Sequence, residues 1–273
     1  MPKTKAASTT TPAVNRSAAP FKPMLAPTSV SCRISRVMRR IPATAKPIPN
    51  TTSGITGIEN PLQVALLQTL QIGGATLHNV VVLVLDDANL NVGIGKQAYQ
   101  IAGIIGFPVF RAFGRITFLR RGGFEAGDTA GRSAAGAQMY MMLLTPVIEC
   151  GVEGKNLPFT IDTGASETNL TARYYDRFRS EARTWKKGTN KGFGAGGVVK
   201  RTIYLQPQLN LAIGDKTTTI KRVPIFTSRI GTYIDDMYGN LGQDAVANFE
   251  SFTLDFSAMT FSLGEPRPPS AGH

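Results

Sequence analysis

Leu157-Pro158-Phe159-Thr160-Ile161-Asp162-Thr163-Gly164-Ala165-Ser166 carries the strongest indication of the fold in this chain. Its apolar first half predicts a strand that carries Asp162 to the surface. Gly164 then permits a tight turn in which backbone N–H groups face the carboxylate and keep it partly ionised. The stretch therefore predicts an acid held in place by its own loop.

The sequence on both sides predicts more strands. Residues 147–151 and 157–161 indicate a hairpin with a turn at 153–156, which delivers Asp162 at its end. Farther along, Tyr238-Gly239-Asn240-Leu241-Gly242-Gln243-Asp244 precedes Phe249 and two alternating runs, at 252–256 and 260–263. We expect a short helix after Gly242 and a closing strand at the end of the lobe.

Together these motifs, from about residue 145 to residue 263, resemble the retropepsin-like aspartic proteases. The resemblance implies that Asp162 is catalytic and that a peptide or protein is the substrate. It also implies that Thr163 turns its hydroxyl inward across a two-fold interface, and that Ser166 braces the outer carboxylate oxygen. The supporting residues would be Thr163, Gly164, Ala165 and Ser166 in the loop, and Leu241 and Gly242 packed behind it. Asn240 departs from the family pattern, which has an apolar residue there.

A glycine-rich run, Gly192-Phe193-Gly194-Ala195-Gly196-Gly197, imitates a dinucleotide-binding fingerprint. It lacks the preceding strand, and a β pattern follows it instead of a helix, which excludes that interpretation. The resemblance makes it a flap that closes over substrate, with Gly192, Gly194, Gly196 and Gly197 as its glycines; the alternative is a plain hairpin turn.

The chain also repeats itself at a nearly constant interval. Gly54-Ile55-Thr56-Gly57 matches the run at 194–197, Leu70-Gln71-Ile72-Gly73 matches the run at 211–214, and Gly103-Ile104-Ile105-Gly106 matches Gly239-Asn240-Leu241-Gly242. This predicts a mainly β protein of the retropepsin or pepsin type, with two β-rich lobes and short helices. The first lobe, residues 50–126, is incomplete, because Met24 to Thr28 stand where its acidic loop belongs.

Composition sets the first residues apart. Residues 1–58 contain nine Lys or Arg and no Asp or Glu, so they supply nine of the twelve net positive charges. We expect residues 1–48 to form a disordered basic tail, because they have too few periodic apolar residues to offset the entropy of ordering. Unrelated, frame-shifted sequence would explain the abrupt start of the first lobe. The remaining expected divisions are a linker at 127–144, the lobe at 145–264 and a tail at 265–273.

Other chemistries are poorly supplied. The two histidines, His78 and His273, do not provide a histidine metal cluster or a Ser-His-Asp triad, and we expect neither a metal nor a cofactor. The two cysteines, Cys32 and Cys150, argue against a disulfide framework. No apolar run has the length of a membrane span.

Three functions remain open. The first is an aspartic endopeptidase in which a homodimer supplies the second Asp162, because one carboxylate cannot act as both acid and base. The second is a catalytically silent pseudo-protease that still binds peptides. The third is a module whose basic tail binds nucleic acid or membrane, although no specific nucleic acid is indicated.

Overall fold

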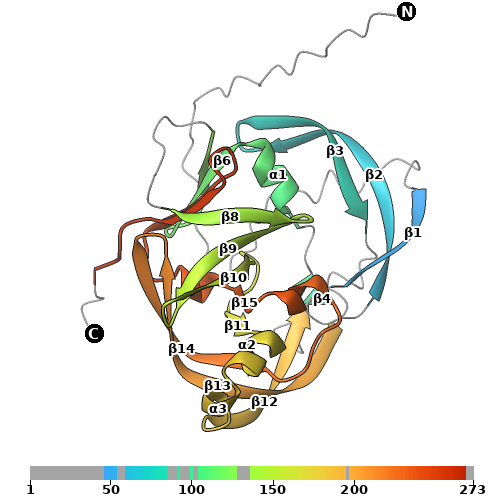
Figure 1. The fold of residues 1–273 in the computed structure, drawn as a ribbon. Helices are drawn as coiled ribbons and strands as arrows, with labels where there is room; N and C mark the ends of the chain where they lie inside the picture. Colours follow the sequence, from blue (N-terminus) through green and yellow to red (C-terminus); the bar gives the residue numbers. More distant parts are fainter. Residues whose placement is uncertain are drawn as a thin grey trace, which may run out of the picture.

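The computed structural model describes residues 46–53, 59–84, 91–92, 99–100, 104–127, 136–194 and 197–268. They form mainly strands with a few short helices, which confirms the expected mainly β class (Figure 1). The strands are β1 (Lys46–Ser53), β2 (Glu59–Ile72), β3 (Ala75–Val84), β4 (Asn91–Val92), β5 (Tyr99–Gln100), β6 (Arg115–Leu119), β7 (Phe124–Ala126), β8 (Ala137–Met142), β9 (Thr145–Val152), β10 (Lys155–Ile161), β11 (Asn169–Leu170), β12 (Lys186–Gly194), β13 (Gly197–Ile213), β14 (Lys216–Phe226), β15 (Gly239–Leu241), β16 (Ser251–Asp255) and β17 (Thr260–Leu263). The helices are α1 (Phe107–Ala112), α2 (Ala172–Arg177) and α3 (Arg179–Ala182), with 3-10 turns η5 (Tyr233–Asp236) and η6 (Gln243–Ala245).

The hairpin expected before Asp162 is present. β9 and β10 pair antiparallel from Val152↔Lys155 to Val147↔Thr160. The turn is shorter than expected, because Glu153 and Gly154 close it with φ values of 48° and 74°. Glycine adopts this left-handed conformation at no steric cost, so Gly154 favours a turn at this point.

Twelve strands form one sheet in the order β12-β13-β14-β11-β15-β10-β9-β8-β17-β16-β6-β7. Within it, β15 pairs parallel with β10 and antiparallel with β11. β10 and β11 are the two strands joined by the loop that carries Asp162. A segment from late in the chain is thus inserted between the ends of that loop and fixes their separation.

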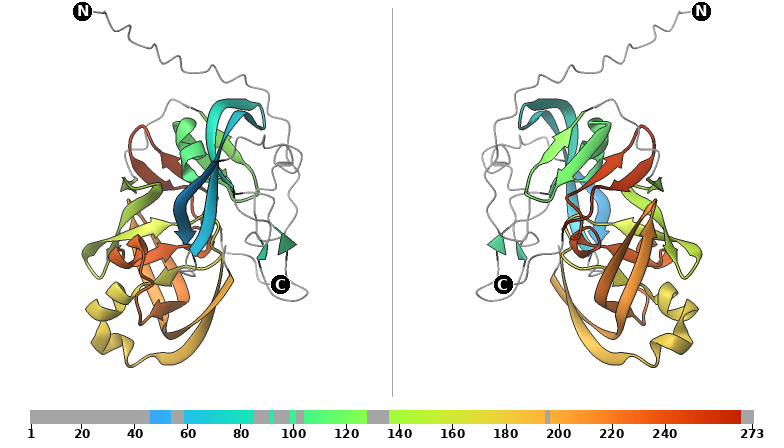
Figure 2. Two further views of the ribbon diagram at one scale, coloured as in Figure 1. Left: turned by 90° about the vertical axis from the view of Figure 1, so that its right-hand side faces the viewer. Right: turned by 90° about the vertical axis from the view of Figure 1, so that its left-hand side faces the viewer.

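A second sheet, of order β1-β2-β3, repeats the order β12-β13-β14 found in the large sheet. β1 begins at Lys46 and β12 at Lys186, and the turns after β2 and β13 begin at Gly73 and Gly214 with φ values of 59° and 61°. Both hairpins contain a residue in the left-handed region with no shift in strand register, Asn79 (φ 56°) in one and Arg222 (φ 58°) in the other. The β1–β3 sheet and strands β12–β14 lie in different parts of the molecule (Figure 2).

The first part of the chain joins the large sheet through β6. β6 pairs antiparallel with β16, and Thr117 lies opposite Thr253. Their Oγ1 atoms are 2.8 Å apart and form a hydrogen bond. Beside them, the rings of Phe118 and Phe252 stack with centroids 4.8 Å apart. This pairing ties residues 115–126 to the sheet that holds Asp162.

Strands or paired backbone occur within three of the segments expected to be a linker or tails. The expected linker, residues 127–144, contains β8, because Ala137 and Met139 alternate into the core and are buried. Of the expected tail, residues 46–48 begin β1, and residues 1–45 lie outside the described part of the chain. At the other end, Arg267 N donates to Asn248 O, so the expected tail at 265–273 begins with paired backbone.

A helical stripe of apolar residues follows the loop. Leu170, Tyr174 and Phe178 are buried, and their spacing of four residues puts them on the inner side of α2 and its flanks. Tyr174 and Phe178 contact each other with ring centroids 4.5 Å apart. The neighbouring arginines, Arg173, Arg177, Arg179 and Arg183, are exposed, as expected for a solvated face.

Candidate active site

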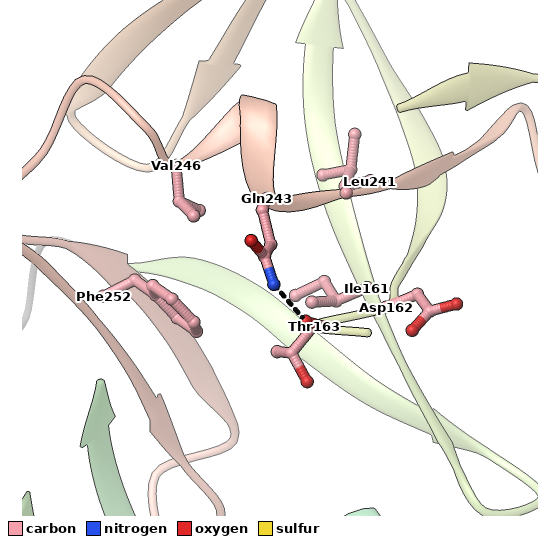
Figure 3. A pocket seen from close by; sticks show the side chains of 8 residues that line it. Ile161, Asp162, Thr163, Leu241, Gln243, Val246 and Phe252 are labelled. Carbon is pink, nitrogen blue, oxygen red and sulfur yellow. Dashed lines mark hydrogen bonds between the residues drawn. The ribbon is translucent and has the colours of Figure 1, made fainter. Parts of the chain in front are cut away.

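Asp162 lies directly after β10, at the surface, as its sequence predicts. Its backbone N–H donates to Leu241 O at 2.9 Å, which anchors it to β15. Its Oδ1 atom accepts from the N–H of Gly164 at 2.9 Å. The carboxylate points away from the small apolar pocket beside it (Figure 3). The carboxyl group is therefore held by a backbone donor while its other oxygen faces outward.

The rest of the loop is held mainly through its backbone. Ala165 N donates to Asp162 O at 3.1 Å, which closes the turn. Gln243 holds the loop from behind, since its Nε2 donates to Thr163 O at 2.9 Å (Figure 3). Its backbone N–H also donates to Ala165 O at 2.9 Å. Ser166 is exposed, and among the described residues it makes no hydrogen bond to Asp162. Ser166 therefore does not brace the carboxylate of Asp162 as expected, and the backbone N–H of Gly164 is the donor instead.

Leu241 and Gly242 lie directly behind the loop. Leu241 is buried and lines the pocket with Ile161. Gly242 leaves no space for a side chain, because a Cβ there would lie 2.5 Å from the carbonyl carbon of Glu167. Gly239 is also tightly enclosed, because a Cβ there would lie 2.7 Å from the ring of Phe159. These two glycines let the late segment approach the loop closely.

Asn240 also fits the packing, although its polarity departs from the family pattern. It is buried, and its Oδ1 accepts from Thr160 Oγ1 at 2.6 Å. A buried polar atom costs little when it is hydrogen-bonded. The threonine on the neighbouring strand β10 thus compensates for the change at this corner.

One supporting pair was missed by the sequence analysis. Asp244 accepts from Thr168 N at 2.8 Å and from Thr168 Oγ1 at 2.5 Å, and Thr168 Oγ1 in turn accepts from Gly242 N at 3.1 Å. This network closes the far end of the loop against η6. The available signal was an acid at the start of a short helix, where backbone N–H groups favour a carboxylate. Nothing in the sequence, however, linked it to Thr168.

The expected flap glycines lie in a hairpin. β12 and β13 pair antiparallel from Lys186↔Leu205 to Gly194↔Gly197, with Gly192 opposite Val199. Gly196 lies outside the described residues. The hairpin is present, and its role as a flap stays a prediction.

The site carries a single ionisable group among the described residues that line its pocket, namely Asp162. The segment expected at the corresponding place in the first lobe, Met24 to Thr28, lies outside the described residues. Across the described ranges, no three His, Cys, Asp or Glu side chains gather in a way that could hold a metal ion. None of the described helices is long and apolar enough to cross a membrane.

Comparison with known proteins gives structural neighbours and no sequence relatives. No family model matches the chain, and no curated protein matches it. Among solved structures it is similar to a retropepsin-like aspartic protease from Rickettsia conorii, at 17% identity over 42% of this chain and 78% of that one, with a TM-score of 0.31. It is similar to EIAV protease complexed with the inhibitor HBY-793, at 19% identity over 38% and 88%, with a TM-score of 0.25. It is also similar to conglutin gamma, a basic 7S globulin from lupine seeds, at 11% identity over 75% and 66%, with a TM-score of 0.41.

Proposed function

We propose that this chain is an aspartic-type endopeptidase of the retropepsin-like group, in which Asp162 activates water for the hydrolysis of peptide bonds. One observation carries the proposal: the loop of Asp162 is held between β10 and β11 by the inserted β15, with a backbone donor on the carboxylate. A surface turn with the same three residues would need no such support from the far end of the chain.

The chemistry needs a second carboxylate. Two carboxylates about 3 Å apart cannot both ionise, so they share one proton. The ionised member takes a proton from water while the protonated member polarises the scissile carbonyl. Asp162 would be one member of such a pair, the β12–β13 hairpin would cover an extended peptide, and no cofactor would be required.

We further propose that the chain supplies both lobes itself. The interval that relates Gly103 to Gly239 in the sequence repeat also relates Thr117 to Thr253. The antiparallel pairing of β6 with β16 is centred on these two threonines, so Phe118 faces Phe252 and Ile116 faces Leu254. Repeat-related residues that meet at the centre of an antiparallel pair are related by a local two-fold axis. Residues 115–126 would then occupy the place of a second protomer.

This pairing favours the second candidate, a peptide-binding pseudo-protease. β16 pairs with β17 on one side and β6 on the other, which leaves no free edge for a second copy. An Asp162–Asp162 pair across that strand would therefore require β6 to leave. Unless the first lobe supplies an acid, Asp162 has no carboxylate partner and the chain binds peptides without cleaving them.

The decisive measurement combines cleavage of a mixed peptide library with binding of a pepstatin-type inhibitor. For an active enzyme we expect cleavage that peaks in mildly acidic solution, where one proton resides on the carboxylate pair. Asp162→Asn should abolish it, with a melting temperature nearly unchanged or slightly raised by relief of carboxylate repulsion. Asp215→Asn, in the exposed turn between β13 and β14, is the matched control and should retain activity.

The other outcomes are also informative. Inhibitor binding without cleavage assigns the chain to the pseudo-protease class. Cleavage that persists in Asp162→Asn removes Asp162 from the catalytic role. The basic-tail function would be favoured if the chain bound no peptide and if deletion of residues 1–45 abolished its binding to nucleic acid or membranes.

A further inference from the structure

The outer edge of β3 is an apolar strand edge without a partner among the described strands. β3 pairs with β2 on one side, and it is the last strand of the sheet β1-β2-β3. Its final five residues, Val80 to Val84, are all apolar, and the side chains of Val81 and Leu83 are 66% and 52% exposed. Edge strands are usually protected by charged residues, prolines or covering elements. No charged residue or proline occurs in this strand.

The corresponding strand of the second hairpin is covered. The left-handed residues Asn79 and Arg222 set the correspondence, so Val80 matches Val223 and Val82 matches Ile225. Val223 and Ile225 are 1% and 0% exposed. Their cover comes from the segment just before β12: Leu170 of β11 pairs parallel with Ile225, and α2 packs against β14.

The chain before β1 is long enough to repeat this cover. Val30 precedes Lys46, the first residue of β1, by the same interval that separates Leu170 from Lys186, the first residue of β12. The segment before β1, residues 1–45, is slightly longer than residues 145–185, which form β9 to α3 in the second half. The covering segment would end where β1 begins.

The sequence in that register has the required apolar positions. Tyr174 in α2 and Phe178 at its C-terminal end are buried, and at the same offset they correspond to Ile34 and Met38. Arg33 and Arg39 correspond to the exposed Arg173 and Arg179. Apolar residues at i, i+4 and i+8 from Val30 repeat the stripe of Leu170, Tyr174 and Phe178.

We infer that residues 29–41 of the same chain dock on the free edge of β3, with Val30 beside Val82 and with Ile34 and Met38 packed over the β2–β3 hairpin. The docked segment converts an aggregation-prone edge into an internal strand. Residues 1–28 remain the basic tail that the composition predicts. The inference concerns the first sheet and does not depend on catalysis by Asp162.

Hydrogen–deuterium exchange of the full-length protein tests this docking. In the wild type, the amides of residues 80–84 should exchange at least about tenfold more slowly than in Val30→Asp or Met38→Asp, because loss of the docked strand exposes the edge. Arg36→Asp is the matched control: its counterpart Asp176 is exposed, and exchange at residues 80–84 should stay at the wild-type rate.

Each other result overturns the inference. Equal exchange of residues 80–84 in the wild type and in Val30→Asp would show that residues 29–41 do not cover the edge. An equal effect of Arg36→Asp would show that the substitutions act through charge. Protection that rises with protein concentration would assign the edge to a second copy of the chain.

Discussion

Gly242 is the residue at which packing of the candidate site is tightest. A Cβ at this position would lie 2.5 Å from the carbonyl carbon of Glu167, a backbone atom that a rotamer change cannot move. We expect Gly242→Ala to lower the free energy of unfolding by about 1–3 kcal/mol, as overpacked cores do. Urea denaturation measures this change.

Gly188→Ala provides the comparison for that substitution. The nearest atom to a Cβ at residue 188 is Cγ1 of Ile203 at 3.9 Å, which is ordinary contact. Alanine there should be neutral or slightly stabilising, because glycine weakens a strand interior. Similar losses at both positions would mean that the contact with Glu167 does not set the cost.

Cys150 makes the free energy of unfolding fall as the pH becomes alkaline. Burial raises the pKa of its thiol above the ordinary value, so the folded state keeps the proton. The unfolded thiol ionises above about pH 8.5, so stability that is complete below that pH should fall by about 1.4 kcal/mol per pH unit above it. Urea unfolding from pH 7 to pH 10 should show this loss, and Cys150→Ala should flatten the curve. An equal slope in both proteins would contradict the assignment.

Tyr174 extends the same effect to higher pH. Burial raises its pKa to about 12, against an opposing hydrogen bond with Gln206. Between about pH 10 and that value, the unfolded state releases a proton that the folded state keeps, so stability falls further. Above about pH 10 the loss of stability from Tyr174 therefore adds to the loss from Cys150.

At the scale of single elements, the pairing of β6 with β16 is the contact that joins the two parts of the chain. Its central hydrogen bond links Thr117 Oγ1 and Thr253 Oγ1 at 2.8 Å. We expect Thr117→Val and Thr253→Val each to cost about 0.5–1.5 kcal/mol, with a coupling of at least about 0.5 kcal/mol in a double-mutant cycle. Thr219→Val, which removes an exposed bond to Asn210, should be additive with either one. If the effects of Thr117→Val and Thr253→Val on the free energy of unfolding were additive, the hydrogen bond between the two threonines would contribute no coupling energy.

The whole molecule should be a monomer. Both edges of β16 are paired within the chain, so the strand has no edge left for a second copy. Light scattering after size exclusion should give a mass near 29.3 kDa for the wild type and for Asp162→Asn. A dimer would restore the homodimer as the source of a second Asp162, and would require the β6 pairing to open.

Much of the candidate site could be predicted from the sequence because its signals are local. The apolar run before Asp162, the turn glycine Gly154 and the stripe of Leu170, Tyr174 and Phe178 depend on neighbours a few residues away. The strand β8 within the expected linker was not predicted, because alternation in a short apolar run indicates a strand only when a partner strand is present.

Local signals in the sequence were sufficient to predict that the chain is mainly β and that Asp162 ends a strand in a glycine turn. Only the tertiary structure decided that Gly164 instead of Ser166 donates to Asp162, that Asp244 binds Thr168, and that Thr117 meets Thr253. The last two of these contacts join residues that are far apart in the sequence. Such pairings follow from the order of strands in the sheet, which local propensity and periodicity leave open because many strands can pair with equal backbone hydrogen bonding.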